Sequence, residues 1–537
     1  MNANSVVRGS VPVAAAEPRG QAGFWALIAT QFQGAFSDNV LKNLVIFMML
    51  GAGLTVAEKH RLGELVGALF SLPFILFSMA GGFLADRHSK RAIMVGVKIF
   101  EVMIMLVALA GFYLANLPVL LACVFLMGTH SAFFGPSKYG VLPELLPKRR
   151  LSWGNGILEL GTFLAIILGT VTAALLAEHF RGRHLWSGAL LVGLALVGLT
   201  TSWGITRVPA AAPDKTFHLN CLKELWRSLQ VARADRPLQL ALVGNTYFFF
   251  LGALLQLNLF YFGAEVLEVS ETKIGLLNVA LAIGIGLGSV TAGYLSGNKI
   301  EYGLVPLGAL GMAATCLALL VKSLQLPGVM ALLAGLGFFG GFFIVPVTAL
   351  LQHRPPARQR GELLAAANLL SFVGVFAASG AHYLLTGWLP FSPREIFFAG
   401  GILTLISAGL SFWLLPDALL RFVLWLATHS LYRIKVLGRK NIPGKGGALL
   451  VCNHLSLVDA VLLQAVVDRP IRFIMLKSLY EKRFIGWWAR ATGAIPISSE
   501  LRPRAMIQSL QTARTAIENG EVVCIFAEGQ ITRIGQM

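Results

Sequence analysis

Charged residues are scarce in this chain. Only 13% of its 537 residues are Asp, Glu, Lys or Arg, whereas 56% are hydrophobic. A soluble globular protein carries about 25% charged residues. The deficit lies mainly between about residues 24 and 415, where apolar runs approach the roughly 20 residues that a helix needs to cross a bilayer. The composition therefore excludes an ordinary soluble protein and predicts a polytopic helical membrane protein.

Cysteine is also sparse, and a signal peptide is missing. Residues 1–20 have neither an apolar core nor a cleavage-like site, so we expect a disordered cytoplasmic lead. The cysteines have no pairing or metal-ligand spacing, which argues against a disulfide framework, and we expect neither a metal nor a cofactor. There are five of them: Cys123, Cys221, Cys316, Cys452 and Cys524.

The net charge of +18 raises nucleic acid as a partner. The alternative is that cytoplasmic loops of membrane proteins accumulate Lys and Arg, and on this ground we expect the lipid bilayer, and no nucleic acid, as the partner. "DRHSKR" (86–91), "PKRR" (147–150) and "HRPPARQR" (353–360) fall on one side together with the central loop. We expect that side, and both termini, to be cytoplasmic, although "RGR" (181–183) and "EKHR" (58–61) run against the rule.

Twelve apolar stretches predict two sets of six membrane helices, which is typical of a two-halved transporter. We assign residues 21–205 to the first half, 206–236 to a central cytoplasmic loop and 237–415 to the second half. The predicted spans are 24–50, 62–84, 92–115, 117–137, 154–178, 184–205, 237–262, 273–296, 301–321, 327–350, 362–388 and 395–415.

The sequence changes in character after residue 415. Aromatic residues lie beside basic ones in 416–436, which suits a helix lying in the membrane interface. Short strand-like runs follow, separated by helical stretches such as 502–519, which Gly520 closes. We therefore expect a small cytoplasmic α/β domain over 437–537. The strand-like runs are "GGALLVCNH", "PIRFIML", "GAIPIS" and "EVVCIFA".

The loop "GGFLADRHSKR" (81–91) joins the second and third predicted spans. It resembles the G-x-L-a-D-r-x-g-r-k signature of the major facilitator superfamily, with Ser89 in place of the usual glycine. Glycine allows close helix approach, and the carboxylate and cations can lock the loop and helix ends in one state, which predicts a gating role. The alternative is a positive-inside loop with an incidental acid. The matching residues are Gly82, Leu84, Asp86, Arg87, Lys90 and Arg91.

A longer stretch is more specific. "FFGPSKYGVLPELLPKRRLSWGNGILELGTFLAIILGT" (133–170) is similar to the segment that marks lysophospholipid transporters within that superfamily. "GNKIEYGLVPLGALGM" (297–312) and "GGFFIVPVTALLQ" (340–352) fit the same group, so the resemblance covers nearly all of the first 415 residues. It implies movement of lysophospholipids from the outer to the inner leaflet of the bacterial inner membrane.

Ionisable side chains within membrane spans are costly and mark functional sites. Asp38 lies midway along the first span, Lys138 ends the fourth, and Glu159 with Asn155 lies in the fifth. One cation and one acid facing a shared cavity would complement the phosphate and ammonium of a lysophosphatidylethanolamine headgroup. These four residues are our candidates for the transport pathway.

Each ionisable candidate also has a structural alternative. Asp38 can pair with Lys42 one helical turn away. Lys138 can extend toward the membrane interface, and Glu159 can serve as a helix-packing partner. For Lys98 and Glu101 in the third span, mutual pairing is the favoured interpretation.

In the tail, "NHLSLVD" (453–459) has an N-H-x4-D arrangement. Residues five apart on one helix point about 140° away from each other, so His454 and Asp459 meet only if His454 precedes the helix and Asp459 lies in its first turn. Asp459 would then orient the imidazole, which would act as a general base. The alternative is that Ser456 is an N-cap paired with Asp459 in a capping arrangement, which leaves His454 idle.

Two further blocks follow, "GAIPIS" (493–498) and "FAEGQITRIG" (526–535). With "NHLSLVD" they resemble the ordered blocks of glycerolipid acyltransferases, most closely the acyl-carrier-protein-dependent 2-acylglycerophosphoethanolamine type. Ala527 departs from the usual proline, and "PISS" (496–499) lacks the charged residue that commonly closes the second block. The resemblance implies an acyl carrier protein or acyl-activating domain as donor, His454 as general base and Asp459 as its orienter. It implies that the glycerophosphate part of the lipid is bound by Glu528, Gly529 and Arg533.

Members of that acyltransferase family continue with a further strand and helix, whereas this chain stops at Met537. We therefore expect an incomplete acyltransferase domain after a twelve-helix facilitator fold. The expected function is lysophospholipid transport coupled to re-acylation by the fused domain. The alternatives are a transporter with an inert tail, a facilitator of other amphiphiles with an inactive remnant, and an acyltransferase that the spans only anchor.

Overall fold

The structure, a computed structural model, describes most of the chain and divides it into two compact units. The first comprises most of the membrane helices and the second contains the α/β tail; each is described by itself. Most of the predicted interfacial segment 416–436, and Arg533, lie outside the described residues. Those residues are 21–50, 56–180, 184–216, 221–297, 299–414, 434, 436–438, 441–443, 446–456, 458–467, 469–497 and 503–529.

Twelve long helices occur where twelve spans were predicted. Ten of them are long and apolar enough to cross a membrane; α10, with 15 residues, and α1, which carries several polar side chains, fall outside that group. The first six are α1 (Gln21–Leu50), α2 (Val56–Arg87), α3 (Lys90–Tyr113), α4 (Leu117–Leu145), α5 (Leu151–His179) and α6 (His184–Trp203). The second six are α8 (Arg236–Tyr261), α9 (Glu271–Leu295), α10 (Leu304–Ala318), α11 (Leu326–His353), α12 (Arg360–Gly387) and α13 (Pro393–Leu414).

Two features of the helices differ from the sequence prediction. The fourth helix does not end at Lys138 but runs on to Leu145, with Pro136 and Pro143 inside it. Proline is tolerated within membrane helices because neighbouring groups satisfy the freed carbonyls. The central loop contains an additional amphipathic helix, α7 (Cys221–Ala234), whose 14 residues are too polar to read as a span.

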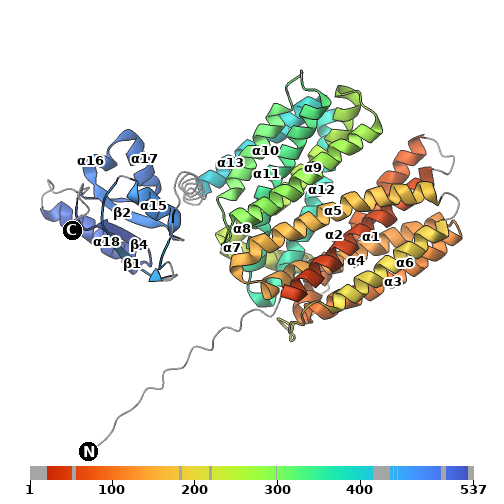
Figure 1. The fold of residues 1–537 in the computed structure, drawn as a ribbon, viewed down its shortest axis with the longest axis horizontal. Coiled ribbons are helices and arrows are strands. Elements are labelled where there is room, and N and C mark those ends of the chain that lie inside the picture. Colours follow the sequence, from red (N-terminus) through yellow and green to blue (C-terminus); the bar gives the residue numbers. More distant parts are fainter. Residues whose placement is uncertain are drawn as a thin grey trace, which may run out of the picture. The chain divides into compact units, whose positions relative to one another are not determined.

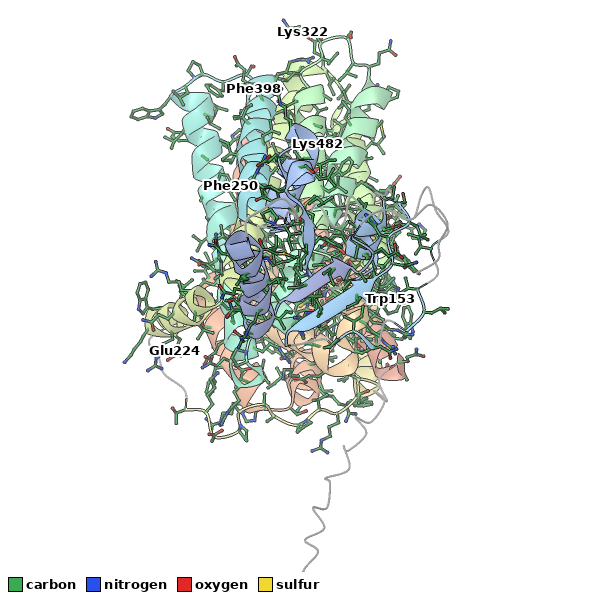
Figure 2. The ribbon with its side chains drawn as sticks, turned by 90° about the vertical axis from the view of Figure 1, so that its left-hand side faces the viewer. Trp153, Glu224, Phe250, Lys322, Phe398 and Lys482 are labelled. Carbon is green, nitrogen blue, oxygen red and sulfur yellow. The ribbon has the colours of Figure 1, made fainter. Side chains whose placement is uncertain are left out.

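Several positively charged turns lie at one end of the bundle, which we call the basic end. It carries the turns at 88–89, 146–150, 204–216 and 354–359, and also α7. Figure 2 shows Glu224 of α7 at this end and Lys322, in the turn after α10, at the other.

The two halves of the bundle meet through glycines near the basic end. In Figure 1, α1 to α6 lie together, with α8, α9, α11 and α12 beside them. A Cβ on Gly82 of α2 would lie 2.6 Å from the Gly361 carbonyl oxygen of α12. A Cβ on Gly156 of α5 would lie 2.4 Å from the Ser289 carbonyl oxygen of α9. Only glycine fits at such separations, so these helices touch backbone to backbone.

Asp86 closes the seam between α2 and α12. Its buried carboxylate accepts hydrogen bonds from the backbone N–H groups of Gly361 (2.6 Å) and Glu362 (3.1 Å) at the start of α12, where the helix dipole favours a negative charge. Lys215, from the central loop, contacts both Asp86 (2.8 Å) and Glu362 (2.7 Å). The loop thereby supplies the cation that balances two carboxylates from opposite halves.

The remaining signature cations hold neighbouring elements at the basic end. Lys90 is buried and pairs with Glu144 at 2.7 Å. Arg91 donates to the Trp203 carbonyl oxygen at 2.7 Å. Arg87 instead lies over the Phe83 ring, at 5.6 Å from its centroid. The contacts of Asp86, Lys90 and Arg91 fit the predicted gating role, which stays a prediction.

The tail forms a parallel four-stranded sheet with strand order β1-β4-β2-β3, seen at the left of Figure 1. α15 packs on a core of Val467, Ile471, Phe473, Val522 and Cys524, whereas α18 packs over Ile495 and Val523. The predicted helix 502–519 is confirmed in α18, and Gly520 has a φ of 85°, which glycine adopts readily. The strands are β1 (Ala448–Cys452), β2 (Ile471–Leu476), β3 (Ile495–Ile497) and β4 (Val522–Phe526). The helices are α15 (Asp459–Val466), α16 (Lys477–Tyr480), α17 (Arg483–Ala491) and α18 (Pro503–Glu518).

The contact of Asp86 with α12 predicts the effect of removing its charge. In Asp86→Asn the basic end should open more often, because the α12 N–H groups and Lys215 lose their anion. A cysteine introduced at Asn368, which bonds to Ser78 in the seam, should then react at least about tenfold faster with a water-soluble maleimide, since a charged hydrogen bond contributes roughly 1.5–3 kcal/mol.

The measurement uses a chain whose native cysteines are replaced. Arg87→Gln is the matched control, because Arg87 lies outside the contact between α2 and α12. Equal labelling rates in the two variants would contradict a role for Asp86 in closing the seam.

Candidate functional site

Asp38 lies on the inner face of the first half, where α1 meets α4. Its Oδ2 atom accepts a hydrogen bond of 2.7 Å from the Ser131 hydroxyl. Its Oδ1 atom is buried and has no hydrogen-bond partner among the described residues. Lys42, the alternative partner, has its Nζ over the Phe70 ring at 5.3 Å from the centroid. The carboxylate of Asp38 is therefore only half satisfied by the protein.

Lys138 is buried inside the bundle, so the interpretation that it extends to the membrane interface is wrong. Its Nζ donates to the Gln31 side-chain oxygen at 3.1 Å and lies 4.3 Å from the centroid of the Tyr139 ring. The Tyr139 hydroxyl donates to Glu159 at 3.2 Å. The carboxylates of Glu159 and Asp38 both act electrostatically on the ammonium of Lys138. Three of the predicted residues therefore belong to one polar region.

The spacing of the two helices explains this arrangement. Gln31 and Asp38 lie seven residues apart on α1, which is two helical turns and one face. Ser131 and Lys138 have the same spacing on α4. Because α1 and α4 run antiparallel, Gln31 meets Lys138 while Asp38 meets Ser131. The two helices place an anion and a cation along one wall.

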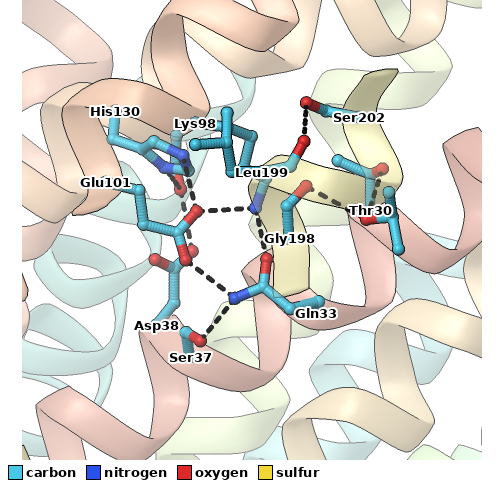
Figure 3. Close-up of polar contacts among 12 residues, drawn as sticks. Thr30, Gln33, Ser37, Asp38, Lys98, Glu101, His130, Gly198, Leu199 and Ser202 are labelled. Atoms are coloured by element: carbon cyan, nitrogen blue, oxygen red, sulfur yellow. Dashed lines mark hydrogen bonds and ion pairs between the residues drawn. The ribbon is translucent and has the colours of Figure 1, made fainter. Parts of the chain in front are cut away.

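A second polar cluster lies next to Asp38, where α1, α3 and α4 meet (Figure 3). Lys98 and Glu101 are fully buried and pair at 2.6 Å, which confirms the predicted pairing. Gln33 bonds to both, at 2.7 and 2.9 Å, and His130 Nε2 lies 3.1 Å from Glu101. Within this cluster the positive charge of Lys98 is balanced by the negative charge of Glu101. The carboxylate of Asp38, in contrast, has a hydrogen bond to only one of its two oxygens among the described residues.

Asn155 lies elsewhere. Its side chain exchanges two hydrogen bonds with Gln352 of α11, at 2.9 and 2.8 Å, and both side chains are fully buried. This pair joins the first half to the second. The structure therefore places Asn155 in the seam between the halves, whereas Asp38, Lys138 and Glu159 share one region.

In the tail, His454 and Asp459 meet in the one arrangement that their spacing allows. β1 ends at Cys452, His454 follows in the loop, and α15 begins at Asp459. His454 Nδ1 lies 3.1 Å from Asp459 Oδ2. The His454 ring stacks on Phe526 of β4 at 4.1 Å between centroids, so two strands and a helix fix the imidazole plane.

Glu528 lies beside this pair. Its Oε2 atom accepts a hydrogen bond of 3.0 Å from the His454 backbone N–H. Gly529 follows with a φ of 68°, a left-handed conformation that suits glycine and closes the turn after β4. These residues lie at the carboxyl ends of parallel strands, the edge where α/β sheets bind their ligands.

The capping alternative is partly present and partly wrong. Asp459 Oδ2 also accepts hydrogen bonds from the backbone N–H groups of Leu455 (2.7 Å) and Ser456 (2.8 Å). Ser456 is not the N-cap: Val458 holds that position, and the Ser456 hydroxyl accepts from the Val458 N–H at 3.3 Å. Burial opposes ionisation of Asp459, but the Ser456 and Leu455 N–H groups and the His454 ring outweigh it and hold the pKa of Asp459 below its usual value. One carboxylate therefore stays ionised, shapes the loop and orients the imidazole.

Comparison with known families covers both parts of the chain. The Major Facilitator Superfamily pattern matches residues 27–379 and 264–421. The chain belongs to the major facilitator superfamily. The Acyltransferase family pattern matches residues 433–537, so this superfamily member carries an acyltransferase domain in its tail.

Among curated proteins, the superfamily member is similar to lysophospholipid transporters named LplT. The protein from Photorhabdus laumondii is 28% identical over 392 residues, which is 72% of this chain and 92% of that protein. The protein from Escherichia coli O157:H7 is 29% identical over 403 residues, 73% of this chain and 96% of that protein.

Solved structures share the fold at low sequence identity. The human organic anion transporter MFSD10 aligns with a TM-score of 0.62 and 15% identity, covering 74% of this chain and all of that chain. FucP in the outward conformation aligns with a TM-score of 0.58 and 12% identity, covering 72% of this chain and 98% of that chain. These likenesses establish the fold alone.

Sequence reasoning missed the uncharged partners of the site. Gln31 and Ser131 hold Lys138 and Asp38, and His130 completes the buried cluster. The seven-residue spacing of polar residues on both helices was the signal that could have found the first two. Phe526 begins the block "FAEGQITRIG", but the sequence did not indicate that its ring stacks on His454.

The buried cluster predicts a strong effect on stability. Lys98→Met leaves Glu101 buried without its cation, which should lower the free energy of unfolding by about 3–5 kcal/mol. Lys98→Met combined with Glu101→Leu should recover most of that loss, because the unpaired charge is gone. Thermal unfolding of the purified chain measures both. Arg227→Met is the control, since Arg227 is a half-exposed ion-pair partner on α7. A loss in Lys98→Met no larger than in this control would contradict the prediction.

Proposed function

We propose that the facilitator part transports lysophospholipids and that the acyltransferase domain re-acylates them. The observation that carries the first part is the wall formed by Asp38 and Lys138, with Glu159 beside them. The similarity to lysophospholipid transporters over about three quarters of the chain supports the same substrate class.

The chemistry of the wall suits a zwitterionic headgroup. Lys138 is held by the neutral oxygen of Gln31, which leaves its ammonium able to bind a phosphate. The unpartnered Oδ1 of Asp38 can accept a hydrogen bond from the ammonium of an ethanolamine group. A headgroup with both charges would therefore bind at both sites. Lysophosphatidylethanolamine meets these requirements.

We place the protein in the bacterial inner membrane with its basic end toward the cytoplasm, in line with the excess of Lys and Arg in short cytoplasmic loops. Both termini are then cytoplasmic and the lipid moves from the outer to the inner leaflet. In the described state the halves touch near the basic end, so this state is the one that receives lipid from the outer leaflet.

The tail supports direct acyl transfer. His454 Nε2 would take the proton of the lysophospholipid hydroxyl. The hydroxyl oxygen would at the same time attack the carbonyl carbon of the thioester. The carbon–sulfur bond then breaks, and the thiolate takes up the proton from the imidazolium. Asp459 holds Nδ1 and stabilises the transient positive charge. In this proposal the glycerophosphate part of the lipid binds beside Glu528 and Gly529, and Arg533 would be the phosphate ligand.

The donor in this proposal is an acyl thioester of an acyl carrier protein, or of an acyl-activating domain. Because transporter (21–415) and acyltransferase (437–537) are one chain, a lipid released at the basic end meets the second site at an increased effective concentration. Consumption of the lysolipid by acylation would keep transport running inward.

Transport is tested by uptake of labelled lysophosphatidylethanolamine into proteoliposomes that contain the purified chain. Asp38→Asn and Lys138→Met should each lower the initial rate at least about tenfold, because each removes one charged contact to the headgroup. Lys322→Met is the control: Lys322 is exposed in the turn after α10, at the end of the bundle opposite the basic end. Full uptake in Asp38→Asn, or an equal loss in the control, would contradict the proposed headgroup site.

Acyl transfer is tested in the same proteoliposomes with an acyl-carrier-protein thioester. His454→Ala should lower formation of the diacyl lipid at least about a hundredfold, the scale of general-base catalysis, while uptake of lysolipid remains. Glu528→Gln should also impair acylation, whereas Glu521→Gln should not, since Glu521 pairs with Arg472 before β4. Acylation that persists in His454→Ala would contradict the assigned role.

A further inference from the structure

A pocket of about 490 Å³ opens at the basic end of the bundle, away from Asp38 and Lys138. α1, α5 and α9 form its walls together with the turn before α5. Its main side chains are Phe24, Trp25, Arg150, Trp153 and Tyr294. The transport and acylation mechanisms use none of them.

The aromatic side chains form a connected surface with an open rim. Phe24 is buried, and its ring centroid lies 5.2 Å from that of Trp153. Trp25 lies 6.2 Å from Trp153, nearly perpendicular to it. Trp25 is 52% exposed and Tyr294 is 67% exposed. Amphipathic rings of this kind lie at the level of lipid headgroups, with one side against acyl chains.

Arg150 gives the pocket its charge. It ends the short 3₁₀ helix Lys148–Arg150 and is exposed. Within the described part of the chain no carboxylate lines this pocket, and none forms an ion pair with Arg150. An exposed guanidinium beside aromatic rings is suited to a phosphate, which its forked donors can hold with two hydrogen bonds.

The pocket depends on contact between the two halves. Phe24, Arg150 and Trp153 belong to the first half, whereas Tyr294 belongs to α9 of the second. A Cβ on Gly293 would lie 2.9 Å from the Trp153 Cα, so α9 and α5 touch directly under the pocket. Separation of α5 from α9 would dismantle the pocket. A ligand that binds here therefore stabilises the state in which the basic end is closed.

We propose that this pocket binds the phosphate and glycerol part of an anionic two-chain phospholipid from the adjacent leaflet, and that this lipid stabilises the closed basic end. Charge selects the occupant, because no carboxylate of the described residues lines the pocket beside Arg150, and Lys148 and Arg149 add positive potential. The exposed rims of Trp25 and Tyr294 provide the surface for the upper parts of the acyl chains. The site is a structural lipid site, separate from the headgroup wall at Asp38.

The test measures the thermal unfolding midpoint of the purified full chain in neutral detergent during titration with dioctanoyl phosphatidylglycerol. The lipid should raise the midpoint of the wild type and of Arg149→Gln, the neighbouring arginine that does not line the pocket. Arg150→Gln should need about tenfold more lipid for the same shift, because the phosphate loses its forked donor. Arg150→Lys keeps the charge, so the lipid concentration that it needs should lie between those of the wild type and Arg150→Gln. This variant replaces Arg150→Gln in the test if Arg150→Gln fails to fold.

Three parallel titrations use dioctanoyl phosphatidylcholine, lysophosphatidylglycerol and inorganic phosphate, each of which should give a smaller shift than phosphatidylglycerol. An equal loss in Arg149→Gln and Arg150→Gln would reveal diffuse charge attraction and overturn the site. An equal shift with phosphatidylcholine or phosphate would overturn the lipid assignment, and tighter binding of lysophosphatidylglycerol would make the pocket a substrate site. A shift lost on deletion of residues 1–20 would also overturn the proposal.

Discussion

A charge inside an apolar bundle must be matched by another polar group, and this constraint organises the facilitator part. Lys98 and Glu101 meet it completely, with Gln33 and His130 around them. Asp38 meets it only in part, since one carboxylate oxygen bonds to Ser131 and the other has no partner within the described residues. Incomplete matching is costly unless a ligand completes it. The difference between these neighbouring clusters separates a structural group from the proposed binding group.

The same constraint operates at the basic end on the scale of whole helices. Asp86 lies fully buried because the first N–H groups of α12 and the ammonium of Lys215 both approach it. Glycines at 82 and 156 let the helices come close enough for these short contacts. In the tail, Asp459 likewise serves two purposes, because one carboxylate fixes the loop backbone and the imidazole together.

Much of this architecture could be predicted from the sequence. Ten of the twelve helices follow from apolar length alone, and the four strands follow from short apolar runs between turn residues. Helical geometry gave the condition under which His454 and Asp459 could meet, and the helix begins where that condition requires. Local patterns were less informative where tertiary contacts decide. The fourth helix, α4, continues past Lys138 despite two prolines, and Val458 takes the N-cap position that the capping alternative gave to Ser456.

The side chains that complete the site depend on pairs distant in the sequence. Ser131 bonds to Asp38 across 93 positions and Gln352 to Asn155 across 197. The seven-residue spacing marks Ser131 as a residue on one helix face, but it does not identify Asp38 as its partner, and the Asn155–Gln352 pair has no local signature. The alternative that Lys138 extends to the membrane interface failed for the same reason: an interfacial lysine and a buried one look alike until the helix packing is known.

The central claim is that Lys138 binds the phosphate of a single-chain phospholipid inside the first half. Solid-state NMR can measure the dipolar coupling between the phosphorus of bound lysophosphatidylethanolamine and a ¹⁵N label on the lysine side chains of the reconstituted chain. A phosphorus–nitrogen separation within about 4 Å, as in a charge-assisted contact, that disappears in Lys138→Met is the predicted result. A coupling unchanged by that substitution, or no coupling with lipid bound, would contradict the account.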